Sequence, residues 1–149
     1  MKKAMLFISM VVIYGFIGYL LHLPMAKLYF PGKVFFVSDV TAAIVAQFKS
    51  AGMFAFCGVI ILTLIRLSNK SKSLKNCVAS YAIWATINLG CLLAILTLKS
   101  KLLEPINEIP TDAIALEQFS TVGSLLVSLV LTCLLLWIVN KSGKSEHEA

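Results

Sequence analysis

The stretch Thr121–Val139 reads TVGSLLVSLVLTCLLLWIV and contains no charged residue. A helix of this length spans about 30 Å, which is the thickness of the hydrocarbon layer of a bilayer. Because backbone N–H and C=O groups must be paired within such a segment in lipid, the stretch predicts a transmembrane helix. Strands would show an alternation of period two, and the stretch does not.

Three further stretches share this apolar character, so the sequence predicts four membrane spans. They lie at about residues 4–23, 50–66, 77–98 and 121–140. The first is long for a signal-peptide core, and Leu21–Met25 contains no Ala-x-Ala-like cleavage site, so we interpret it as a retained helix. We expect an all-α fold with a single four-helix transmembrane domain, followed by a flexible cytoplasmic tail at residues 141–149.

The composition indicates the same class of protein. Hydrophobic residues make up 59% of the 149 residues and charged residues 13%, and the mean hydropathy is +0.91. In a soluble domain about 45–50% of the residues are apolar and about 25% are charged. A small soluble domain has too much surface to bury the additional apolar residues of this chain. These values argue against a soluble enzyme, a disordered chain and a nucleic-acid-binding domain. The expected partner is the lipid bilayer, and no nucleic-acid partner is expected.

Basic residues are distributed unevenly over the connections. Suppose that the N-terminus, the short connection between the second and third spans, and the C-terminus share one side. That side then holds eight basic residues: Lys2, Lys3, Arg66, Lys70, Lys72, Lys75, Lys141 and Lys144. The positive-inside rule places this side in the cytoplasm. We therefore expect a multi-pass protein of the bacterial inner membrane with both termini cytoplasmic.

Both long loops follow a span, pass two prolines and reach a Ser/Thr-Asp pair. In the pairs Ser38-Asp39 and Thr111-Asp112, the Ser or Thr is suited to the N-cap of a helix and the Asp to its first turn. We therefore expect the second and fourth spans to begin near Asp39 and Asp112, outside the membrane. Gln47–Gly52 also matches Gln118–Gly123 at Gln, Phe and Gly, at an offset of 71 residues. The pattern indicates two parallel helical hairpins from a duplication. Chance similarity between helix starts of like composition is the alternative.

A proline after the first span, two hairpins of this size and a Phe-x-x-x-x-small pattern from Phe119 occur together in the chain. In these features it resembles, over most of its length, a group of small four-helix bacterial integral membrane proteins of unknown function. The resemblance implies the four-helix architecture. Those proteins carry a histidine at the start of the last helix, where this chain has Gly123, so the resemblance implies no shared chemistry.

The chain offers few groups for catalysis or metal binding. No charged residue lies in the interior of a span, which argues against a proton-coupled transporter working alone. The cysteines at 57, 77, 91 and 133 form no Cys-x-x-Cys pair, and we interpret them as packing residues. His22 has no second histidine near it in the membrane, so we expect no metal ion, haem or other cofactor.

Asn88 lies near the centre of the third span, where its amide requires a partner. A row of hydroxyls follows one face of the fourth span: Ser120, Ser124, Ser128 and Thr132. We expect Asn88 to face the bundle interior and to bind a hydroxyl or a carbonyl, with a role in a ligand site as the alternative. Small residues are expected to allow close helix contacts in the first and third spans: Gly15, Gly18, Gly90 and Ala94.

We expect any binding site to lie in the outer half of the bundle, because only the long loops could cover it. The candidate ligand or partner site consists of seven residues: His22, Tyr29, Phe35, Gln47, Asn88, Gln118 and Ser124. The two Gln-Phe pairs could face each other across the repeat, or the two amides could simply lie among lipid headgroups. The apolar stretch Val34–Val37 either dips into the outer interface, packs across the bundle mouth or offers a partner surface.

The sequence thus predicts a non-enzymatic membrane module. Through its outer half it would bind a protein partner, such as another membrane protein or a second copy of itself, or a lipid-soluble ligand. One alternative is an immunity protein against a pore-forming toxin, since such proteins are small, multi-pass and without catalytic groups. The other is a small membrane enzyme or transporter that uses Asn88, the hydroxyl row and His22.

Overall fold

The computed structural model describes residues 2–68, 74–103 and 113–145. Within them it has four long helices: α1 (Lys2–Tyr29), α2 (Val40–Ser68), α3 (Leu74–Leu103) and α4 (Val122–Ser145). The strands β1 (Val34–Phe36) and β2 (Ala113–Ala115) and the 3-10 turn η1 (Leu116–Gln118) lie in the connections. All four helices are long and apolar enough to cross a membrane, which confirms the predicted all-α four-helix fold.

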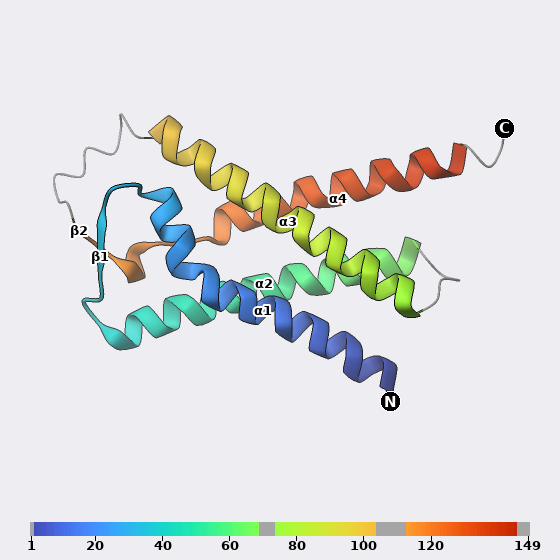
Figure 1. The fold of residues 1–149 in the computed structure, drawn as a ribbon, viewed down its shortest axis with the longest axis horizontal. Coiled ribbons are helices and arrows are strands. Elements are labelled where there is room, and N and C mark those ends of the chain that lie inside the picture. The colour runs from blue at the N-terminus through green and yellow to red at the C-terminus, as the bar shows by residue number, and fades with distance from the viewer. Residues whose placement is uncertain (1, 69–73, 104–112, 146–149) are drawn as a thin grey trace.

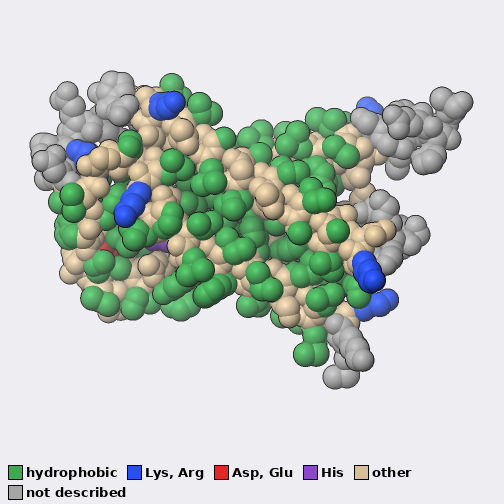
Figure 2. All heavy atoms as spheres, in the orientation of Figure 1, with side chains coloured by type: hydrophobic (Ala, Val, Ile, Leu, Met, Phe, Trp, Pro, Cys, Tyr) green, Lys and Arg blue, Asp and Glu red, His purple; other side chains and the backbone are tan. Residues whose placement is uncertain are grey.

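The bundle has two distinct ends. The strands β1 and β2 lie at one of them, the strand end, whereas α1 begins, α2 ends, α3 begins and α4 ends at the other, the terminal end (Figure 1). The start of α1 and the end of α4 thus lie at the same end of the bundle as the end of α2 and the start of α3. On the face shown in Figure 2, apolar side chains cover the middle of the bundle, and Lys and Arg side chains lie toward both ends. This distribution suits a bundle whose middle lies in hydrocarbon.

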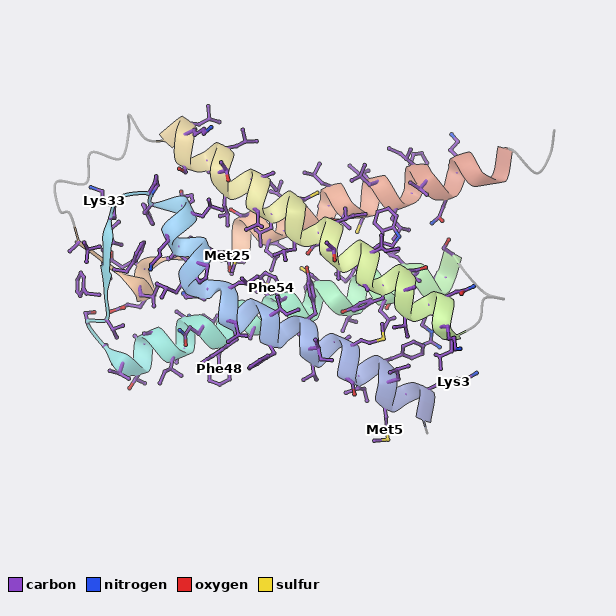
Figure 3. The ribbon with its side chains drawn as sticks, in the orientation of Figure 1. Lys3, Met5, Met25, Lys33, Phe48 and Phe54 are labelled. Carbon is purple, nitrogen blue, oxygen red and sulfur yellow. The ribbon has the colours of Figure 1, made fainter. Side chains whose placement is uncertain are left out.

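Glycine allows α1 to approach α2 closely. A Cβ atom at Gly18 would lie 2.5 Å from two atoms of the Phe54 ring, and a Cβ atom at Gly15 would lie 3.1 Å from the carbonyl oxygen of Ala51. Phe54 itself is fully buried, between α1 and α2 (Figure 3). The predicted notch in the first span is therefore confirmed.

The small residues of α3 do not make such a contact. Gly90 and Ala94 are exposed, and no described atom lies within 4 Å of a Cβ built at Gly90. The prediction of a close helix contact here is wrong. The reason is that α3 turns the face with Tyr81, Asn88 and Leu92 toward the other helices, and this face is buried.

The start of α2 agrees with the sequence. The helix begins at Val40, and the carboxylate of Asp39 accepts a hydrogen bond of 2.8 Å from the backbone N–H of Thr41. The carbonyl of Asp39 also accepts the first helical bond, from Ala43. Asp39 is therefore the N-cap residue, and not Ser38 as predicted, because the Ser38 hydroxyl donates to Glu117 instead.

The start of α4 differs from the prediction of a helix near Asp112. Residues 113–115 instead form β2, which pairs in parallel with β1 so that Phe35 lies opposite Ile114. The chain then passes through η1 and an extended segment before α4 begins at Val122. The pairing with β1 holds this backbone extended, and the segment buries Ile114, Leu116 and Phe119 at the strand end. Thr111 and Asp112 lie outside the described residues.

The helices also extend beyond the predicted spans. α1 continues through Pro24 to Tyr29, and α4 continues to Ser145, into the stretch expected to be a flexible tail. Hydropathy marks only the part of a helix that lies in hydrocarbon, so it underestimates helices that extend into the interface. Residues 146–149 lie outside the described residues.

Candidate functional site

A buried polar network joins three helices in the middle of the bundle. The amide oxygen of Asn88 accepts a hydrogen bond of 2.7 Å from the Tyr14 hydroxyl. The amide nitrogen of Asn88 donates to the hydroxyls of Ser128 and Thr132, each at 3.2 Å. Those two hydroxyls donate in turn to the backbone carbonyls of Leu125 and Ser128. The prediction that Asn88 faces the interior and binds a hydroxyl is confirmed.

This network leaves the amide of Asn88 without a free donor. Both hydrogens of its NH₂ group are used, and its oxygen has a partner. The side chain is 0% exposed. These bonds fix α1, α3 and α4 relative to one another. Asn88 lies apart from a second polar site, a pocket at the strand end of the bundle.

A pocket of about 330 Å³ lies at the strand end, between α2 and the segment that leads into α4. We call it the His22 pocket. It combines one imidazole, three hydroxyls, one ammonium and one carboxylate with apolar walls. Its lining residues are His22, Ala42, Val45, Ala46, Lys49, Ser50, Glu117, Phe119, Ser120, Thr121 and Val122.

His22 is the most unusual group in this pocket. Its side chain is 1% exposed, yet neither ring nitrogen has a hydrogen-bond partner among the described residues. The carbonyl of Leu116 approaches the ring without reaching hydrogen-bond geometry, and the Phe119 ring lies 5.5 Å away, centroid to centroid. A buried polar group without a partner costs about 1–3 kcal/mol, so such a group indicates a place for a missing partner.

Two hydroxyls lie in the same pocket. The Ser50 hydroxyl donates to the carbonyl of Gly18 at 3.2 Å, and it lies 3.4 Å from the Thr121 hydroxyl. Ser50 and Thr121 are both buried. They connect α1, α2 and the start of α4 at the level of the pocket.

Glu117 lines the pocket and is hydrogen-bonded to the residues before α2. One of its carboxylate oxygens accepts hydrogen bonds from the Ser38 hydroxyl and from the backbone N–H groups of Ser38 and Asp39. The bond from the Ser38 hydroxyl is the main reason why the pKa of Glu117 lies below its ordinary value. Its second oxygen is buried and has no partner among the described residues. One carboxylate oxygen of Glu117 therefore joins η1 to the residues at the start of α2, and the other oxygen remains available to a ligand.

Two more hollows lie on the sides of the bundle. One, of about 280 Å³, lies between α1 and α3 beside Tyr14 and Tyr81; the other, of about 460 Å³, lies between α1 and α2 beside Gly15 and Gly52. Both have mainly apolar linings, as expected for surfaces that lipid acyl chains cover. The His22 pocket stands apart because it gathers charged and hydroxyl groups.

The structure brings together only part of the candidate site. His22 lines the pocket, and Tyr29 packs on Phe119 with ring centroids 5.8 Å apart. Phe35 lies farther out, where its ring centroid is 6.3 Å from that of Phe30. Ser124 is buried one turn below Ser120, outside the pocket lining.

The two Gln-Phe pairs do not face each other. Phe48 is 64% exposed at the edge of the bundle (Figure 3), whereas Phe119 is 4% exposed inside it. Gln47 is half-buried and Gln118 is exposed, and neither lines the His22 pocket. The cause is local: Phe48 lies within α2, but Phe119 belongs to the extended segment before α4, so the matched residues point in different directions.

The candidate site predicted from the sequence contains one of the eleven lining residues, His22. Four of the polar lining residues that it left out bear on the site: Lys49, Ser50, Glu117 and Thr121. A signal for three of them existed, because Lys49 and Ser50 stand inside the repeated segment that also contains Thr121. Glu117 had no such signal. Its role depends on a hydrogen bond to Ser38, 79 residues away in the chain.

The described part of the chain contains no group of three or more His, Cys, Asp or Glu side chains that could hold a metal ion. The four cysteines are free thiols within helices, with Cys57 fully buried in the core. The groups that line the His22 pocket can form hydrogen bonds and charge interactions.

Comparison of the chain with protein-family models, with curated proteins and with solved structures finds no match.

Proposed function

We propose that this protein is a non-enzymatic module of the bacterial inner membrane that binds a lipid-soluble ligand in the His22 pocket. The single observation that carries the proposal is the buried imidazole of His22, whose two nitrogens lack partners among the described residues. In its neutral form an imidazole has one N–H donor and one acceptor nitrogen. A ligand with a hydrogen-bonding head would satisfy groups that the fold leaves unsatisfied.

The residues at the mouth of the pocket favour a ligand that enters from the membrane. Three of the lining residues are exposed, namely Val45, Lys49 and Ser120, so the opening lies between α2 and the start of α4. Ile44 and Phe48, on the same part of α2, are exposed apolar residues. A molecule with an apolar tail could thus place its head in the pocket while its tail stays in lipid.

The proposed orientation has the strand end outside and both termini in the cytoplasm. Arg66 and Lys75 lie at the terminal end beside the short connection, and the sequence adds Lys70 and Lys72 within it. Such a cluster in a short connection favours the cytoplasmic side. In this orientation the His22 pocket faces the outer leaflet.

The contacts of the buried groups favour this function over a transporter that uses Asn88. A transport path needs polar groups that can exchange partners with a solute, and the donors of Asn88 are already occupied by Ser128 and Thr132. The alternative of an immunity protein stays a prediction.

A pair of variants on α2 tests the proposal. Ala46 lines the pocket, so Ala46→Phe should fill it without removing any polar group. Ile44→Phe places the same ring on the exposed side of the same helix, outside the pocket, and is the control. Small molecules that co-purify with each variant are identified by mass spectrometry after gentle extraction from membranes.

We expect the natural chain and Ile44→Phe to retain a common lipid-soluble molecule that Ala46→Phe loses. If Ala46→Phe folds and retains the same set of molecules as the control, the pocket is not a binding site and the proposal is wrong.

A further inference from the structure

We infer that the ligand of the His22 pocket is a phospholipid with a primary ammonium in its headgroup, bound with the ammonium inside and the phosphate at Lys49. This inference rests on the proposed ligand-binding function and adds the chemical class of the ligand. It is carried by the charges that line the pocket, by the direction of the hydrogen bonds inside it, and by the level of the pocket along the bundle.

The pocket holds one charge of each sign, at different depths. Lys49 is exposed at the mouth, whereas Glu117 is half-buried and has one buried oxygen without a partner among the described residues. The two formal charges cancel, so a ligand with a net charge would meet repulsion from one of them. A zwitterionic headgroup meets attraction from both if its cation lies inside and its anion lies at the mouth.

The free polar atoms inside are mainly acceptors. Ser50 has one hydroxyl proton and donates it to the carbonyl of Gly18, so the Thr121 hydroxyl is left to donate to Ser50. Thr121 then keeps free lone pairs, and the second oxygen of Glu117 can only accept. With one nitrogen of His22, these groups suit a head that donates several hydrogen bonds. A primary ammonium has three N–H donors, whereas a quaternary ammonium has none.

The level of the pocket matches that of lipid headgroups. Lys49 directly precedes the uncharged stretch 50–65 of α2, and Thr121 directly precedes α4. Both therefore mark the boundary between hydrocarbon and interface. A volume of about 330 Å³ lies at the lower end of the range for ligand sites, enough for a headgroup while the acyl chains stay in the surrounding lipid.

The test measures lipid binding to the delipidated full chain by native mass spectrometry. The probes are phosphatidylethanolamine, phosphatidylcholine and phosphatidylglycerol with identical acyl chains. Phosphatidylethanolamine should bind about tenfold more tightly than either of the others, which corresponds to about 1.4 kcal/mol. Phosphatidylcholine has the same charges without N–H donors, and phosphatidylglycerol has no cation.

Two matched pairs of variants assign the preference to its residues. Glu117→Gln should reduce the preference for phosphatidylethanolamine over phosphatidylcholine to near one. Ser38→Ala removes the hydroxyl that donates to Glu117 but leaves the carboxylate in place, so it should keep the preference. Lys49→Ala should weaken the binding of both zwitterionic lipids. Lys27→Ala removes an exposed lysine outside the pocket lining and should weaken the binding of neither.

The outcomes separate the inference from the proposed function. Equal binding of phosphatidylethanolamine and phosphatidylcholine would overturn the assignment of the headgroup. If another lipid-soluble molecule then occupies the protein and Ala46→Phe displaces it, the proposed function stands without this assignment. If Ala46→Phe alters the binding of no lipid and of no co-purified molecule, both the inference and the proposed function are wrong.

Discussion

Two buried tyrosine hydroxyls show how differently single residues contribute to this bundle. The Tyr14 hydroxyl donates to the Asn88 amide and lies 3.2 Å from the carbonyl of Ala85. The Tyr81 hydroxyl is buried without a partner among the described residues, in space that Gly58 leaves open. A Cβ at Gly58 would lie 2.5 Å from this hydroxyl. Hydrogen bonding therefore stabilises the bundle at Tyr14 and not at Tyr81.

This difference predicts opposite effects of the same substitution. Tyr14→Phe leaves the oxygen of Asn88 without its tyrosine donor and should destabilise the protein by about 1–3 kcal/mol. Tyr81→Phe removes an unsatisfied hydroxyl and should be neutral or stabilise the protein by up to about 1 kcal/mol. The free energy of unfolding in mixed detergent micelles measures both effects. Equal destabilisation by the two variants would contradict the hydrogen-bond assignment.

At the scale of the element, the packing of α1 on α2 depends on one missing side chain. Gly18→Ala places a methyl group 2.5 Å from the buried Phe54 ring, which should destabilise the protein by about 1–3 kcal/mol through overpacking. Gly90→Ala adds a methyl group where no described atom lies within 4 Å, and alanine favours a helix by up to about 1 kcal/mol. The two variants should therefore shift the thermal unfolding midpoint in opposite directions, and a shared direction would refute the packing argument.

The attachment of η1 to the start of α2 should depend on pH. The Ser38 hydroxyl and backbone N–H groups favour the ionised form of Glu117, so its folded-state pKa lies below its ordinary value of 4.5. The stabilisation is then fully present at neutral pH and is lost as the pH falls through that lowered pKa. The backbone amide resonance of Ser38 should report the loss in the natural chain. In Glu117→Gln it should show no such transition, and an identical titration in both proteins would exclude Glu117 as its cause.

The whole molecule shows what the sequence could predict. Hydropathy alone predicted the four helices. Asn88 alone predicted which face of α3 turns toward the other helices, because an unpaired amide in hydrocarbon costs several kcal/mol. The strands were not predictable, because three-residue segments depend on a partner far along the chain. Of the His22 pocket only His22 itself was predicted, since Glu117 is held there by hydrogen bonds to the residues before α2, far away in the sequence.

The relation between the two hairpins is also visible at this scale. Tyr14 contacts Ala85, and Ser50 contacts Thr121, and both pairs are separated by the 71 residues of the sequence match. Residues that are 71 positions apart thus contact each other where the two hairpins pack together. The strand pairing follows a different offset, with Val34 opposite Ala113. A common origin of the hairpins stays a prediction.

The orientation of the molecule in the membrane can be checked with reporter fusions. Fusions after Lys72 and after Lys144 should report a cytoplasmic location, and fusions near Lys33 and Glu108 should report a periplasmic one, because basic residues are concentrated in the short connection and at the termini. A periplasmic signal after Lys72 would reverse the orientation and place the His22 pocket on the cytoplasmic side.

The binding of a ligand beside His22 is tested most directly by nitrogen-15 spectroscopy of the histidine rings. The chain has two histidines, His22 in the pocket and His147 near the C-terminus, so uniform histidine labelling gives two assignable sets of signals. Protein extracted gently from membranes and the same protein after exhaustive delipidation should differ in the ring-nitrogen shifts of His22 and agree in those of His147. Unchanged His22 shifts in the two preparations would show that no ligand contacts the imidazole and would contradict the account.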